Sequence, residues 1–118
     1  MELRIVVDSA LLDKVVATLP DLLADVVAVA AHNVESRAKA IIVEKRIIDT
    51  GATLNSTQAR RVEGDRFAWR VGPTTEYAPF LEFGTTRMAA RPFMVPAAEA
   101  EREPFNNAVK AVIEKAAG

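Results

Sequence analysis

Residues that could do acid–base or metal chemistry are few and far apart in this chain. The single histidine, His32, lies beside Asn33 in a helical pattern, and one histidine cannot build a histidine-rich metal site. The chain has no cysteine, which excludes disulfides, thiolate chemistry and zinc–cysteine sites. Glu82 is followed by Arg87 and Arg91, but no base or metal ligand is placed beside it. We therefore expect an ion pair at Glu82, within its own segment or across a subunit boundary, and no catalytic residue, cofactor or metal.

The sharpest enzyme-like run is Ile47-Ile-Asp-Thr-Gly-Ala52, which resembles the active-site loop of retroviral-type aspartic proteases. Those small chains dimerise so that two Asp-Thr-Gly loops share one proton. They are almost wholly β around the loop, whereas here a helical pattern leads into Asp49. We favour a turn that ends a helix, with Asp49 and Gly51 as turn residues. A dimeric aspartic protease, inactivated by Asp49→Asn, is kept as a distant alternative.

A modest basic segment is formed by Arg60, Arg61, Arg66 and Arg70. Arginines so placed could contact a phosphate backbone, although the formal net charge of −1 does not call for nucleic acid as a partner. We favour a solvated strand face. A DNA-binding module is the alternative, and it predicts salt-sensitive DNA binding that is lost when these arginines are replaced.

Length and composition indicate one domain, residues 1–118. Half of the residues are hydrophobic and about a quarter are charged, as in folded soluble domains. The N-terminus lacks the pattern of a signal peptide, and no apolar run is long enough for a membrane span. We expect a protein made in the cytoplasm, with no membrane partner.

The first half of the chain predicts one strand and two helices. Leu3–Val7 is rich in β-formers, and Ser9–Thr18 has a helical pattern. From Pro20 to about Lys45, apolar residues recur at three- and four-residue steps, which predicts a long amphipathic helix.

The second half predicts a sheet and a closing helix. Residues 59–63 and 66–72 alternate around Gly64-Asp65, the pattern of a β-hairpin. Residues 77–83 are interpreted as a third strand of this meander, and Pro96–Ala117 as a helix in which Pro104 starts a second segment. The expected fold is therefore α+β: a long N-terminal helix on a small antiparallel sheet, with a C-terminal helix closing the domain.

Large apolar, turn-forming and charged residues are densest in the segment Tyr77–Pro96. Aromatic anchors, arginines for bidentate pairing and prolines that lower the entropy of ordering are what a subunit interface requires. We interpret this segment as an arm that docks on another subunit, with the alanine-rich flank of the long helix as its groove. Phe93→Ala should then weaken assembly and spare folding. The candidate interface residues are Tyr77, Phe80, Glu82, Phe83, Arg87, Arg91, Pro92 and Phe93.

Three motifs together resemble the gene-product-ten-like tail-component family, the neck or tail-completion proteins of long-tailed phages. They are Asp49-Thr-Gly-Ala-Thr-Leu-Asn-Ser56, Tyr77-Ala-Pro-Phe-Leu-Glu-Phe-Gly-Thr85, and Met88-Ala-Ala-Arg-Pro-Phe93 followed by Pro96-Ala97. The family places a helix before the first motif, a hairpin after it, and the last helix after the third. The predicted elements follow this order.

The resemblance implies a non-enzymatic virion protein that forms a ring, commonly six-fold, at the head–tail junction. Its implied partners are itself, a head-side connector or stopper protein, and the tail-tube or tail terminator protein. DNA would pass through the ring only as cargo, and assembly would take place in the host cytoplasm. A tail terminator that caps the tube is the close alternative, since terminators are also α+β proteins.

Overall fold

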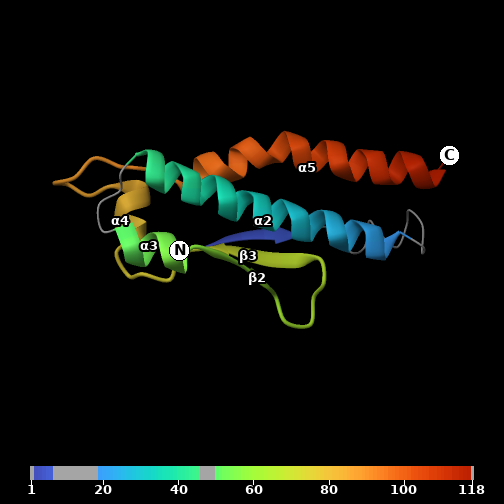
Figure 1. Ribbon diagram of the computed structural model, residues 1–118, viewed down its shortest axis with the longest axis horizontal. Coiled ribbons are helices and arrows are strands. Elements are labelled where there is room, and N and C mark those ends of the chain that lie inside the picture. The colour runs from blue at the N-terminus through green and yellow to red at the C-terminus, as the bar shows by residue number, and fades with distance from the viewer. Residues whose placement is uncertain (1, 7–18, 46–49, 118) are drawn as a thin grey trace.

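The computed structural model describes residues 2–6, 19–45 and 50–117, and the predicted helix over 9–18 and Asp49 lie outside this part of the chain. The described residues form four helices and three strands (Figure 1). In chain order these are β1 (Leu3–Val6), α2 (Pro20–Glu44), α3 (Thr50–Ser56), β2 (Gln58–Arg61), β3 (Ala68–Gly72), α4 (Ala78–Phe83) and α5 (Met94–Ala117). This confirms the predicted α+β class, the long helix on the sheet and the closing helix.

The sheet is antiparallel, with strand order β1-β3-β2. The turn between β2 and β3 contains Gly64 at φ 80°, a left-handed conformation that glycine adopts without the cost of a Cβ. Asp65 supports this turn by accepting the backbone N–H of Phe67 through its carboxylate, at 2.9 Å. The predicted hairpin is confirmed.

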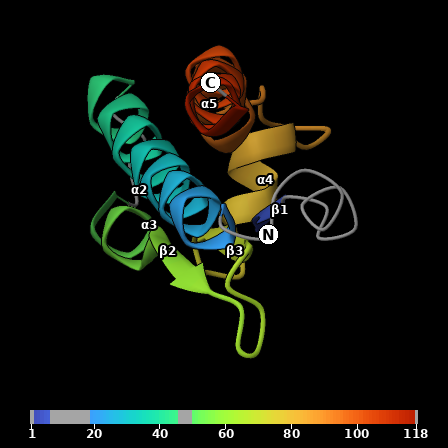
Figure 2. The same ribbon diagram turned by 90° about the vertical axis from the view of Figure 1, so that its right-hand side faces the viewer.

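Helix α2 and helix α5 lie on the same side of the sheet (Figures 1 and 2). Alternate residues of the strands, among them Ile5 and Val71, pack against α2, whose buried stripe includes Ala31, Val34 and Ala38. The small alanines of this stripe let neighbouring elements approach closely. The alanine-rich flank is therefore largely occupied within the subunit, which corrects its assignment as a groove for a second subunit.

The segment from Tyr77 to Phe83 is not a strand; residues 78–83 form helix α4. Two features favour the helix. Pro79 stands in its first turn, where the missing N–H removes no intrahelical bond, and Tyr77, Phe80 and Phe83 recur at three-residue steps. Over so short a run, the apolar pattern fits both periods.

Two further expectations about helix boundaries are wrong. Gly51 is not a left-handed turn residue, because it lies in the first turn of α3. Pro104 does not start a second segment, because α5 runs through it without interruption. Pro104 is solvent-exposed, so water can satisfy the carbonyl that its missing N–H leaves free.

Candidate subunit interface

Residues 77–92, called the arm below, consist of α4 and the loop that follows it. In Figure 1 this loop projects beyond the ends of α2 and α5. Its geometry starts at Gly84, which ends α4 with φ 77°. A Cβ at this position would stand 2.8 Å from the backbone nitrogen of Ala90 and 2.9 Å from the carbonyl oxygen of Met88. Because the loop residues Met88 and Ala90 pass so close, position 84 requires glycine.

The loop closes on itself through backbone hydrogen bonds. The Thr85 N–H donates to the Met88 carbonyl at 2.8 Å, and the Arg91 N–H donates to the Leu81 carbonyl of α4 at 2.7 Å. At the base, the Lys45 ammonium reaches the carbonyl of Pro92 at 3.3 Å. These contacts fix the loop to α4 and to the end of α2.

Glu82 fastens the arm to the core. Its side chain is buried, at 3% exposed, and its carboxylate accepts three backbone N–H groups from the start of α5. Oε1 accepts those of Phe93 at 3.0 Å and Met94 at 2.9 Å, and Oε2 accepts that of Val95 at 3.2 Å. The first N–H groups of a helix have no intrahelical partner, and its N-terminus favours a negative charge. Glu82 therefore acts as a capping carboxylate supplied from α4, not as the expected partner of an arginine.

The outward side of the arm is apolar and aromatic. Phe80 is 55% exposed and Phe83 is 68% exposed, and Tyr77 and Met88 are exposed to a lesser degree. The three aromatic residues follow one stripe of α4 because they are three positions apart. Exposed phenylalanines grouped in this way are typical of a surface that binds a partner.

Six of the eight candidate interface residues remain accessible in the subunit, and two do not. Phe93 is fully buried in the main core, and Glu82 is buried under the start of α5. Neither can contact another subunit while this one stays folded. The expectation that Phe93→Ala would spare folding is therefore wrong, because the substitution would open a cavity in the core.

A shallow apolar hollow of about 240 Å³ lies between α2 and α5, far from the arm's own base. Its walls include Val29, which is well exposed, together with Pro104 and Phe105. Asp25 stands at this hollow with its side chain exposed, whereas Glu101 there is already paired with Arg37 at 3.2 Å. The hollow therefore combines apolar walls with the carboxylate of Asp25, which makes no ion pair with any other described residue.

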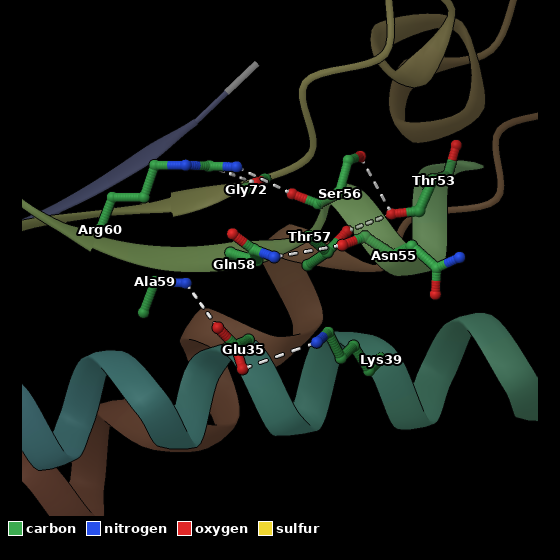
Figure 3. Close-up of polar contacts among 10 residues, drawn as sticks. All are labelled: Glu35, Lys39, Thr53, Asn55, Ser56, Thr57, Gln58, Ala59, Arg60 and Gly72. Carbon is green, nitrogen blue, oxygen red and sulfur yellow. Dashed lines mark hydrogen bonds and ion pairs between the residues drawn. The ribbon is translucent and has the colours of Figure 1, made fainter. Parts of the chain in front are cut away.

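The Asp-Thr-Gly motif leads into α3, which is part of the structural frame (Figure 3). Thr57 donates its hydroxyl to the carbonyl of Thr53 at 2.7 Å, and the Ser56 hydroxyl accepts the N–H of Thr74 at 3.1 Å. Glu35 of α2 accepts the N–H of Ala59 at 2.6 Å. The Ser56 bond fastens α3 to the loop after β3, and the Glu35 bond fastens β2 to α2.

The four arginines of the hairpin do not form one surface. Arg66 pairs with Asp21 at the start of α2, and Arg61 lies on the sheet face that α2 covers, in register with Trp69. Arg60 and Arg70 lie on the opposite face, in register with each other. Arg4 on β1 is paired with Arg70 as well, and only the strand register identifies this third arginine of the face.

His32 is exposed on α2 and packs edge-on against Trp69, with ring centroids 5.1 Å apart. Among the described residues there is no cluster of acidic or histidine side chains that could hold a metal ion. Within the same residues, no helix is long and apolar enough to cross a membrane.

Comparison of the chain with protein-family models, with curated proteins and with solved structures found no match.

Proposed function

We propose that the protein is a structural subunit of a closed ring at the head–tail junction of a long-tailed phage or prophage. The observation that carries this proposal is the arm: exposed aromatic residues on a segment that a buried carboxylate and close backbone contacts hold in one shape. A surface of this kind loses little conformational entropy on docking, so less of the free energy gained by its burial is lost in ordering it. The head–tail junction is proposed as the location of the ring because the sequence motifs resemble those of neck and tail-completion proteins.

The receiving surface in this proposal is the hollow between α2 and α5 of a second copy. A contact between an arm and a different patch of the next subunit is heterologous, and repeating it generates a ring when the rotation closes. Charge supports the pairing. Arg87 and Arg91 are exposed on the arm and make no ion pair among the described residues, while Asp25 offers a free carboxylate at the hollow.

The test is the mass of the particle in solution, measured by light scattering over a concentration series with negative-stain imaging. The expected result is rings, or a monomer that closes into rings when mixed with tail tubes or connector-bearing heads. Phe80→Ser combined with Phe83→Ser should abolish ring formation because it removes the exposed aromatic anchors. Val43→Ser is the matched control, since Val43 is equally exposed but belongs to neither surface.

Val29→Asp tests the hollow independently of the arm, because it places a charge among the apolar walls of the hollow and leaves the arm unchanged. It should prevent rings as the arm variant does. A stable dimer or monomer that ignores both tubes and heads would overturn the proposal. Selective binding to tube ends over connector-bearing heads would assign the ring to the tail terminator position.

A further inference from the structure

Three arginines, one on each strand, form a row across the sheet. The register pairs Arg4 of β1 with Arg70 of β3, and Arg70 with Arg60 of β2. Neighbouring strands lie about 4.8 Å apart, so the row is about 10 Å long. Arg4 and Arg70 are exposed, and Arg60 is partly exposed.

The row faces away from the two long helices. Side chains alternate between the two faces of a strand, and the residues that flank the row, Ile5 and Trp69, pack against the core under α2. Their neighbours Arg4 and Arg70 therefore point to the other side. Both long helices lie on the core side of the sheet in Figures 1 and 2.

Among the described residues, no carboxylate forms an ion pair with this row. Arg60 donates to the carbonyls of Gly72 at 3.3 Å and Ser56 at 3.2 Å, which fixes its guanidinium but leaves its charge (Figure 3). No ion pair involves Arg4 or Arg70 in the part of the chain that the structure describes. Like charges directly opposite each other destabilise a sheet, so the row has a cost in the free subunit.

We propose that this row binds the phosphate backbone of a nucleic acid without reading its sequence. Arginine donates bidentate, charge-assisted hydrogen bonds to phosphate. A row of about 10 Å spans about three nucleotides of one strand, which rises by about 3.4 Å per nucleotide.

The same surface does not suit a protein partner. Stable protein interfaces have an apolar or aromatic centre, and none of the exposed large hydrophobic residues among the described residues lies on a strand of the sheet. No aromatic side chain stands on the row either, so base stacking, the usual mode of single-strand binding, is not offered. Glu2 and Glu63 line the shallow hollow beside Arg60 and Arg70, which limits the affinity to that of weak, non-specific binding.

The experiment is a fluorescence anisotropy titration of a short labelled duplex of mixed sequence, at several salt concentrations. It is made on the wild-type chain and on the arm variant Phe80→Ser/Phe83→Ser, so that binding by one subunit is separated from ring formation. Three phosphate contacts predict a slope of log K against log salt of about −2.7, or a roughly 40-fold loss between about 50 and about 200 mM salt. Arg4→Gln combined with Arg70→Gln should reduce the slope to about −0.9.

The matched control is Arg102→Gln combined with Lys110→Gln, which removes the same charge from exposed positions on α5. This control should keep the wild-type slope. Three results would overturn the proposal: no binding at the lowest salt, an equal loss in the control, or equally tight binding of poly-glutamate, which would assign the row to an acidic protein. The arm variant keeps all three arginines of the row. Loss of ring formation and loss of DNA binding can therefore be distinguished.

Discussion

The arm and the outer face of the sheet are both exposed surfaces of one small domain, yet their chemistry is opposite. The arm presents phenylalanines on a segment held by a buried carboxylate, while the sheet presents a row of arginines. In the proposed ring, the docked arm would bury its exposed apolar area, and the free energy of that burial depends only weakly on salt. The arginine row gains by releasing counterions from a polyanion, which salt opposes strongly. Under the two proposals, one chain would bind two kinds of partner through separate surfaces.

The largest effect is expected from a comparison of two phenylalanines in the segment Tyr77–Pro96, one buried and one exposed. Phe93→Ala should lower the free energy of unfolding by about 3–5 kcal/mol, because it empties a fully buried site. Phe83→Ala should change it by less than about 0.5 kcal/mol, since that ring is mostly exposed. Urea unfolding followed by circular dichroism measures both, and equal stabilities would refute the division of the segment into an inner and an outer side.

The capping carboxylate gives the next largest effect. Glu82→Gln keeps the size of the side chain but turns one acceptor into an amide donor that faces the N–H groups of α5. We expect a loss of about 1.5–3 kcal/mol, the range for hydrogen bonds to charged groups. Glu76→Gln, at an exposed position before the same helix, should be neutral. A neutral Glu82→Gln in the same unfolding assay would show that the cap contributes little.

Gly84 in the arm and Gly64 in the hairpin both have a left-handed backbone conformation, so the same substitution can be compared in the two regions. Gly64→Ala should cost about 1–2 kcal/mol, the price of a left-handed backbone alone, because a Cβ there meets nothing within 4 Å. Gly84→Ala should cost clearly more than Gly64→Ala, because backbone atoms of Met88 and Ala90 must also move. Thermal unfolding of the pair decides the matter, and an equal shift would mean that the arm is looser than described.

The smallest effect is a gain. Arg70→Thr should raise the free energy of unfolding by about 0.2–1 kcal/mol, since it removes like-charge pairing with Arg4 and Arg60 on both neighbouring strands. Arg61→Thr is the control, because the residue directly opposite Arg61 on β3 is Trp69 and not an arginine. The gain should shrink at high salt, where the charges are screened. A loss of stability in Arg70→Thr would mean that this arginine stabilises the sheet.

The sequence correctly predicts those elements whose apolar pattern is long enough to distinguish the period of a helix from that of a strand. The apolar steps between Pro20 and Lys45 fit only a helix, and the alternation around Gly64 fits only a hairpin, and both predictions are confirmed. The six residues of α4 are too few to separate a period of two from one of three to four, so the strand assignment was wrong.

The candidate site could be predicted only in part, because burial depends on contacts between distant segments. The sequence places Glu82 and Phe93 in a segment suited to an interface, but only the fold brings Glu82 under the start of α5. Arg4 is remote from Arg70 in the chain, and their pairing follows from strand register, which no local pattern specifies. The sequence shows which charged residues are present and how they are spaced, but only the fold shows which residue each of them contacts.

The contact between Glu82 and α5 has a consequence for how the domain opens. First-turn amides of a helix ordinarily exchange with solvent deuterium early, because they lack an intrahelical acceptor. Here the amides of Phe93, Met94 and Val95 are held by a carboxylate from α4, so they can exchange only when the two helices separate. Their protection factors should therefore report how often α4 separates from the start of α5.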